Sequence, residues 1–263
     1  MYEFEYVKAA SLDDAAKRLA NDEAKLVAGG MTLIPTLKFR LAKPTELIDL
    51  GGLGNLNGIS EDGNAVVIGA MTRHAEVNRS AVVKRAIPAL AAMAGMIGDP
   101  AVRNRGTIGG SIANNDPAAD YPAAVVALNA TVRTNKREIA ADSFFTGMFE
   151  TVLAPDEIIT AVRFPKPDAG NYQKFRNPAS RYAIVGVYVA RAGGGVRVAV
   201  TGAGPCVFRV PEMEAALSKS FSPDAIKDIA IKDDGLNSDI HASAEYRAHL
   251  VTVMARRAVA ACA

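Results

Sequence analysis

Two glycine-bearing segments contain the residue types best suited to chemistry in this 263-residue chain. The first reads Leu26-Val27-Ala28-Gly29-Gly30-Met31-Thr32-Leu33 and lies where a short apolar strand is expected to pass into a helix. Paired glycines let the backbone approach a ligand, and N–H groups at the start of a helix have no intrahelical partner. The segment therefore suits an anionic group such as a phosphate.

The second segment reads Arg103-Asn104-Arg105-Gly106-Thr107-Ile108-Gly109-Gly110-Ser111, again with a glycine pair, hydroxyls on both sides and two arginines. Successive N–H groups in turn conformations form anion-binding nests without a lysine. Each segment alone is also compatible with a simple turn, but two in one domain could hold the two charges of a pyrophosphate. Neither matches GxGxxG or GxxxxGK[ST], which disfavours a Rossmann site and a P-loop and leaves a nucleotide cofactor in a different fold.

The remaining residue types give little support for catalysis by side chains. Three histidines, His74, His241 and His249, are scattered along the sequence, which disfavours a metal site. The two cysteines, Cys206 and Cys262, form no CxxC pair, so this chain alone cannot ligate an iron–sulfur cluster. A GxSxG motif is absent as well. This inventory is typical of a protein that binds a redox cofactor.

Charge and hydropathy narrow the possible partners and the location. Lys and Arg number 30 against 28 Asp and Glu, and so balanced a mixture disfavours nucleic acid as a partner. No run of about 18 apolar residues occurs, so we expect at most peripheral membrane association. The mixed, acidic start and the small number of cysteines favour the cytoplasm.

The first fifty residues alternate strand and helix patterns, which favours an α/β unit. Strands are expected at 2–7, 25–28 and 46–50, and helices at 11–20 and 33–40. A glycine-rich stretch at 51–58 separates this unit from the next one. For the second unit we expect strands at 65–69 and 157–164, helices at 72–78, 80–97 and 121–130 with Asp120 as a possible N-cap, and a long irregular segment at 98–121.

The pattern changes after Pro165, Pro167 and Gly170, where we place a domain boundary. Consecutive strands follow, and helices come after them, which is typical of a small α+β domain. The expected strands are 172–175, 183–191 and 196–201, and the expected helices are 211–217, 223–230 and 243–260. The sequence thus predicts units at 1–55, 56–168 and 169–263.

Both glycine segments, extended to Ala28–Pro35 and Arg103–Asp120, resemble a known pair of signatures. They are similar to the FAD-binding signatures of the medium subunit of molybdenum hydroxylases, of the carbon monoxide dehydrogenase and xanthine dehydrogenase type. Tyr172–Phe175, Ala179–Val187 and Ser243–Arg247 resemble the C-terminal domain of the same family. The resemblance therefore covers the whole chain.

The resemblance implies an α+β (mixed α/β) protein with a vanillyl-alcohol-oxidase/PCMH-type FAD-binding fold. In that fold, two α/β subdomains clasp FAD and a small C-terminal α+β domain closes over the flavin. The residues that the resemblance places at the cofactor are Leu26, Val27, Ala28, Gly29, Gly30, Met31, Thr32, Leu33, Ile97, Thr107, Ile108, Gly109, Gly110, Ser111, Asp120, Ile158, Lys174 and Tyr182.

The family assigns these residues different roles. The two glycine segments supply backbone contacts to the pyrophosphate, and Asp120 bonds the ribityl or ribose region. Lys174 and Tyr182 lie beside the isoalloxazine ring, where a cation can stabilise a reduced, anionic flavin. Met31 departs from the pattern, because the family usually has a polar residue there. Its side chain cannot give the usual hydrogen bond or a histidyl link.

By this resemblance the chain is the FAD-binding electron-transfer subunit of a heterotrimer that is itself expected to dimerise. A small partner would carry two [2Fe–2S] clusters, a large partner would carry molybdopterin, and the acceptor would be quinone, NAD or oxygen. The substrate could be carbon monoxide, a purine, an aldehyde or an N-heterocycle. Two alternatives stand beside this reading: a self-sufficient FAD-dependent reductase or oxidase of the same fold, and a flavin-free scaffold.

Overall fold

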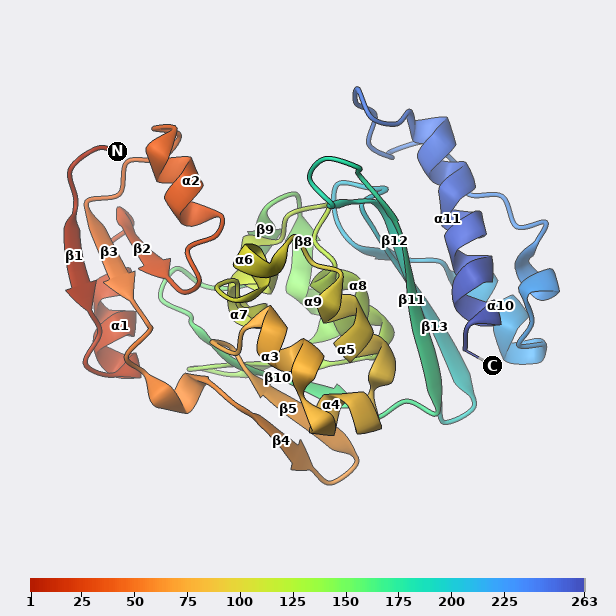
Figure 1. Cartoon of the computed structure of the whole chain (residues 1–263), viewed down its shortest axis with the longest axis horizontal. Coiled ribbons are helices and arrows are strands. Elements are labelled where there is room, and N and C mark those ends of the chain that lie inside the picture. Colours follow the sequence, from red (N-terminus) through yellow and green to blue (C-terminus); the bar gives the residue numbers. More distant parts are fainter. Residues whose placement is uncertain (263) are drawn as a thin grey trace.

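Three sheets follow one another along the long axis of the molecule in a computed structural model that describes residues 1–262 (Figure 1). The N-terminal sheet lies at one end, a five-stranded sheet lies in the middle, and the C-terminal sheet with its helices lies at the other end. Each sheet contributes to a hydrophobic cluster, and the C-terminal sheet also contributes to the cluster of the middle unit. The protein is a mixed α/β protein, as the sequence predicts.

The N-terminal unit is a parallel three-stranded sheet in the order β1-β3-β2, with helices between the strands. Its elements are β1 (Glu5–Lys8), α1 (Leu12–Leu19), β2 (Ala24–Val27), α2 (Leu33–Lys38), β3 (Glu46–Asp49) and the 3-10 turn η1 (Gly54–Leu56). Ser11 caps α1, since its side chain accepts a hydrogen bond from the Asp14 N–H at 3.0 Å. All the strands and helices expected here are present, within a few residues at their ends.

The middle sheet is antiparallel throughout, in the order β4-β5-β10-β6-β7. Its strands are β4 (Ile59–Asp62), β5 (Ala65–Gly69), β6 (Thr131–Thr134), β7 (Glu138–Ala140) and β10 (Ile159–Pro165), and a separate small hairpin joins β8 (Phe145–Gly147) to β9 (Glu150–Thr151). The sequence predicts β5 and β10, which contribute wholly buried residues such as Ile68 and Phe164. It misses the other strands of this unit, which are short and have a weak apolar pattern: β4, β6, β7, β8 and β9.

The helices of the middle unit differ from expectation at two places. The expected helix at 80–97 is two helices, α4 (Ala81–Ala86) and α5 (Pro88–Gly95), because Pro88 lacks an N–H and pushes the residue before it out of helical geometry. The expected irregular segment at 98–121 is wrong. It contains α6 (Pro100–Arg103) and α7 (Ile108–Asn114).

Of these two helices, α6 spans only four residues. The helix α7 was unexpected because Gly109 and Gly110 lie in its first turn, and glycine disfavours a helix interior. Side-chain caps and close packing offset that cost. Asp99 Oδ1 accepts the Val102 N–H at 2.9 Å, and Thr107 Oγ1 accepts the Gly110 N–H at 3.2 Å. The other helices of this unit are α3 (His74–Arg79), α8 (Tyr121–Ala127) and α9 (Ala141–Phe144).

The C-terminal sheet is antiparallel in the order β11-β12-β13-β14 and is covered on both faces. Its elements are β11 (Ala169–Arg176), β12 (Ala183–Ala192), β13 (Gly195–Thr201), β14 (Phe208–Arg209), α10 (Pro211–Lys219), η2 (Pro223–Ile226) and α11 (Ala244–Ala260). Tyr188 points into the middle core, whereas Val187 points into the core beneath α11. The expected helix at 223–230 is only a short 3-10 turn.

No helix among residues 1–262 combines the length and the apolar character that crossing a membrane requires.

Candidate functional site

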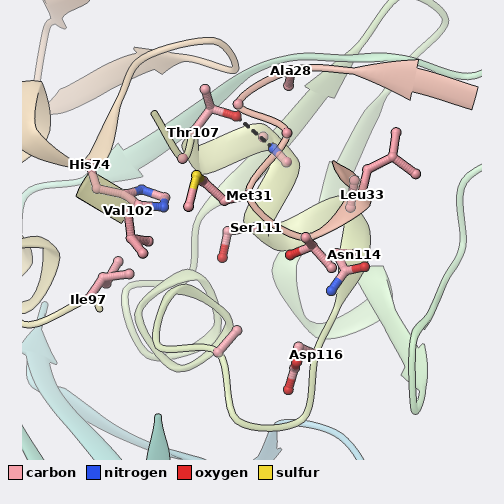
Figure 2. A pocket seen from close by; sticks show the side chains of 18 of the residues that line it. Ala28, Met31, Leu33, His74, Ile97, Val102, Thr107, Ser111, Asn114 and Asp116 are labelled. Atoms are coloured by element: carbon pink, nitrogen blue, oxygen red, sulfur yellow. Dashed lines mark hydrogen bonds between the residues drawn. The ribbon is translucent and has the colours of Figure 1, made fainter. Parts of the chain in front are cut away.

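A cavity of about 600 Å³ lies where the three units meet, a size ordinary for a cofactor site. Both glycine segments line it, and β10, β11 and the loop before β12 contribute to its walls. Figure 2 shows Ala28 and Leu33 on one wall and His74, Val102 and Ile97 on another, with the Ser111 hydroxyl directed between them. The structure thus brings together segments far apart in the sequence.

Sixteen of the eighteen residues expected at the cofactor line this cavity, all except Val27 and Ile108. The Val27 carbonyl accepts the Leu50 N–H at 3.0 Å within the N-terminal unit. The Ile108 side chain is wholly buried in the middle core. Those two residues support the wall from behind.

The first glycine segment presents free backbone donors to the cavity. It leaves the end of β2 and turns at Gly30, whose φ of 72° lies in the left-handed region that glycine adopts without strain. Within residues 1–262, the N–H groups from Gly29 to Thr32 donate to no oxygen of the protein. This run of unused donors ahead of α2 is suited to an anionic group.

The second glycine segment uses its donors within the fold. The Ile108 and Gly109 N–H groups donate to the carbonyls of Thr72 and Ala70, at 3.1 and 2.9 Å. The next two N–H groups, those of Gly110 and Ser111, donate to the Thr107 hydroxyl and carbonyl. This segment therefore offers the Ser111 hydroxyl and a surface bare of side chains, rather than a run of free N–H groups.

The two segments touch each other through their backbones. A Cβ atom at Gly29 would lie 2.2 Å from the carbonyl oxygen of Arg105 and 2.8 Å from the Cα of Gly106. At Gly110, a Cβ atom would meet the Thr107 hydroxyl at 3.0 Å and the Ala28 methyl at 3.8 Å, with the rest of its surroundings open to the cavity. Glycine is thus required at 29 for contact and leaves space at 110.

A buried ionic network lies at another part of the wall. Asp120, at the start of α8, accepts hydrogen bonds from the Tyr172 hydroxyl at 2.5 Å and from Lys174 Nζ at 2.8 Å, both on β11. The Asp120 and Lys174 side chains are only 4 % and 2 % exposed. The expected N-cap role of Asp120 is wrong, because its side chain caps no helical N–H and is used in this network instead.

The electrostatics of this network follow from its burial. Loss of water raises the pKa of the Asp120 carboxyl, while the Lys174 ammonium and the Tyr172 hydroxyl act in the opposite direction. Burial, together with the Asp120 charge, raises the pKa of Tyr172 well above its usual range, so the phenol keeps its proton and donates. The network fixes Lys174, and it joins the middle unit to the C-terminal sheet.

Tyr182 lies in the loop before β12 and is 47 % exposed to solvent, whereas the side chain of Lys174, the other residue expected beside the flavin ring, is buried. Asn177 shapes this loop, because its side-chain oxygen accepts the N–H groups of Ala179 and Ser180 at 2.9 and 3.1 Å. Arg181 adopts a φ of 63°, which turns the chain just before the tyrosine. The Asn177-Pro178 pair is the sequence signal that could have indicated this loop, because Asn-Pro pairs mark turns.

Sequence reasoning missed several polar residues of the cavity wall. His74 is 4 % exposed and no hydrogen bond to its ring is found within residues 1–262; burial, and secondarily the charge of Arg103, lowers its pKa to about 4. Asp116, Asn114 and Arg181 also line the cavity. A lone histidine carries no motif, but Asp116 and Asn114 lie inside the Arg103–Asp120 string and could have been found there.

The comparisons with known proteins cover the same two parts of the chain. The model of the FAD binding domain in molybdopterin dehydrogenase matches residues 2–167, and that of the CO dehydrogenase flavoprotein C-terminal domain matches residues 171–262. The nicotine 6-hydroxylase medium subunit of Paenarthrobacter nicotinovorans is 39% identical over 97% of this chain and 95% of its own length. The carbon monoxide dehydrogenase medium chain of Hydrogenophaga pseudoflava is 35% identical over 97% and 96%.

Solved structures agree with these relatives. The carbon monoxide dehydrogenase of Hydrogenophaga pseudoflava superposes with a TM-score of 0.89 at 33% identity, covering 99% of this chain and 97% of that one. Quinoline 2-oxidoreductase from Pseudomonas putida 86 gives a TM-score of 0.89 at 28% identity, with 99% and 97% covered. The chain therefore belongs to the FAD-binding medium subunits of the molybdenum hydroxylase oxidoreductases, of the carbon monoxide dehydrogenase and xanthine dehydrogenase type, and its cofactor is FAD.

Proposed function

We propose that this chain is the electron-transfer subunit of its complex, that it holds FAD in the cavity between the two glycine segments and Lys174, and that it contacts FAD through the sixteen expected residues that line this cavity. The single observation that carries this proposal is the set of polar groups on the cavity wall. Free backbone donors from Gly29 to Thr32 form one part, and the buried Asp120–Lys174 pair forms another.

The first segment binds the pyrophosphate in this proposal. Its N–H groups have no partner in the described chain, and a phosphate would satisfy donors that otherwise lack one. The Ser111 hydroxyl and the bare surface of Gly110 border the same space. Because Gly110 has no side chain, the pyrophosphate can approach the backbone of the second segment closely.

The C-terminal sheet orients the flavin. Lys174 is held by Asp120 and also lies 3.4 Å from the Met96 carbonyl oxygen, so its charge has a fixed position beside Ile97. Tyr182 covers an open side of the cavity, and its ring can exclude water from the flavin. Bound FAD would supply the reversible electron-transfer chemistry that the side chains of this site do not provide.

The complex proposed around this chain has three kinds of subunit. The names of the relatives, medium subunit and medium chain, support the proposal that this chain has partner chains. Within residues 1–262 its only free cysteines are Cys206 and Cys262, too few to ligate an iron–sulfur cluster. Electrons would then arrive from a small [2Fe–2S] subunit, which receives them from a large molybdopterin subunit, and would leave to quinone, NAD or oxygen. We place this assembly, a dimerised heterotrimer, in the cytoplasm.

We also propose three structural units at 1–55, 56–168 and 169–263. The separate sheets support this division, although the middle core also takes in Tyr172 and Tyr188 from the C-terminal sheet. The units therefore pack as one body around the cavity.

A valine at Gly110 tests the cofactor site. In Gly110→Val the γ-methyl groups project into the open side of the cavity, so purified protein is expected to lose nearly all of its bound flavin. Gly195→Val, in an exposed hairpin where valine suits the strand, is the matched control and should retain flavin. Absorption spectra of both variants give the flavin content, and full flavin in Gly110→Val would contradict the proposed position of the pyrophosphate.

Purification of the native complex tests the electron-transfer role. We expect larger and smaller chains with molybdenum and iron to co-purify with this one. Recovery of an active, flavin-containing protein with neither metal and no partner would support the self-sufficient reductase or oxidase instead. Absence of flavin bands after reconstitution would leave only a scaffold.

A further inference from the structure

We propose that His74 is a further cofactor-positioning residue, whose imidazole forms a hydrogen bond with the flavin-ring end of FAD. This inference rests on the proposed site and adds to it a residue that neither glycine segment nor the C-terminal sheet contains.

The ring of His74 lies in the cavity wall and is deeply buried. His74 is the first residue of α3, lines the cavity, and is 4 % exposed. Figure 2 shows its ring on the same wall as Val102 and Ile97. A polar side chain so deeply buried normally has a hydrogen-bonding partner, and for this ring none is found within residues 1–262.

The two ring nitrogens have different surroundings. Nδ1 is fully enclosed by protein, with the Tyr121 ring at a centroid distance of 5.4 Å. Nε2 is not enclosed in this way and lies next to Gly106, where a Cβ atom would be only 2.6 Å from it. The nitrogen that can reach a group in the cavity is therefore Nε2.

The second glycine segment is built to accommodate this ring. Gly106 has no positive φ, so the backbone conformation does not require glycine there. Glycine is required because a Cβ atom would collide with the ring of His74. The backbone fixes the same approach, because the His74 N–H donates to the Gly106 carbonyl at 3.0 Å and the Ile108 N–H donates to the Thr72 carbonyl at 3.1 Å. Gly106 thus leaves the space that the imidazole ring of His74 occupies at the cavity wall.

The neighbouring wall indicates which end of the cofactor His74 meets. The Met96 carbonyl lies 3.4 Å from Lys174 Nζ, and Arg103 Nη1 donates to the Ile97 carbonyl at 2.9 Å. The segment from Met96 to Arg103 therefore runs between Lys174 and the part of the wall that His74 shares with Val102. This places His74 towards the proposed flavin end of the cavity.

The charge state of His74 defines what it contributes. Burial, and to a smaller extent Arg103, lowers its pKa to about 4, so the ring is neutral near pH 7 and has one donor and one acceptor nitrogen. It can give direction to a hydrogen bond without adding a charge. Lys174 already supplies the positive charge on this side.

The test compares FAD with ADP, which lacks the flavin end. Full-length apoprotein of wild type, His74→Leu, His74→Gln and the exposed control His249→Leu is titrated with each ligand by calorimetry. We expect His74→Leu to bind FAD about tenfold more weakly than wild type and ADP equally well, since one hydrogen bond is lost. His74→Gln should recover part of the affinity, and the control should match wild type.

The outcomes separate the two proposals. Wild type that binds neither FAD nor ADP refutes the proposed site. If wild type binds both, unchanged FAD affinity in His74→Leu, or an equal loss for FAD and ADP in a variant with a wild-type melting temperature, overturns the role of His74. A shift in the visible spectrum of the bound flavin in His74→Leu would support it.

A second measurement does not depend on any variant folding. The chain has only three histidines, so the imidazole ¹⁵N signals of labelled protein can be assigned. FAD is expected to shift the Nε2 signal of His74 strongly, and ADP is expected to leave it unchanged. A His74 signal that does not respond to FAD would overturn the inference.

Discussion

The two glycine segments look alike in sequence and differ in what their backbones do. Both contain a Gly-Gly pair close to a threonine and the start of a helix. In the first segment, Gly30 turns with a positive φ and the neighbouring N–H groups remain free. In the second, Gly109 of α7 packs against Ala70, and the N–H groups donate hydrogen bonds within the fold. The same dipeptide thus makes a donor loop in one place and a close contact in the other.

The difference shows that a glycine motif does not by itself define an anion site. A backbone N–H group stays free when no carbonyl oxygen is positioned to accept its hydrogen bond, and this depends on neighbours distant in sequence. Thr72 and Ala70 supply such carbonyls to the second segment. In the first segment the Arg105 carbonyl lies against the Cα of Gly29, and within residues 1–262 no carbonyl accepts from the N–H groups of Gly29 to Thr32. Four substitutions in these segments should separate the two backbone roles.

Gly29→Ala should separate the two segments and have the largest effect. The new Cβ atom would lie 2.2 Å from the Arg105 carbonyl oxygen, and this backbone atom can move away only if the two segments separate. We expect the free energy of unfolding of the apoprotein to fall by about 3 kcal/mol, together with loss of bound FAD. Urea unfolding and flavin content measure the two effects. A variant with normal values for both would show that the segments need not touch.

Gly109→Ala should affect stability and leave FAD affinity largely unchanged. Its Cβ atom would meet the Ala70 methyl at 2.6 Å and the Ala70 carbonyl at 2.8 Å, on the side facing the core. We expect a loss of about 2 kcal/mol in the apoprotein, and the folded variant should bind FAD within a few-fold of wild type.

Gly30→Ala is the counterpart in the first segment. Alanine there must adopt a φ of 72°, which distorts the donor loop at a conformational cost of about 1 kcal/mol. FAD affinity should therefore fall more in Gly30→Ala than in Gly109→Ala, as calorimetric titration can establish. The reverse order would mean that the donor role belongs to the second segment.

Thr107→Ala should have the smallest effect. It removes the side-chain oxygen that accepts the Gly110 N–H at 3.2 Å, and loss of an N-cap costs about 1 kcal/mol. Thr107→Ser keeps the hydroxyl and should unfold like wild type. Thermal unfolding of the apoproteins measures the difference, and equal melting temperatures for the alanine and serine variants would show that the cap contributes nothing to α7.

The sequence predicts most of the long elements and many of the cavity residues. The alternating pattern of the first fifty residues and the apolar run at 183–191 predict strands that the structure contains. The short strand at 131–134 and the helix α7 were missed, because their local patterns are weak and their neighbours in space stabilise them. Gly109 illustrates this, since its helical conformation depends on Ala70.

Sequence alone determined that this chain lacks the cysteines for an iron–sulfur cluster and contains the two glycine segments of its family, because composition and local motifs can be read from residue types. Only the tertiary structure decided which segment keeps free donors, that Asp120 pairs with Lys174 and Tyr172 instead of capping α8, and that His74 faces the cavity. Each of these depends on atoms that approach one another across tens of residues. Hydrogen bonds and burial assign such roles in three dimensions, and no local pattern records them.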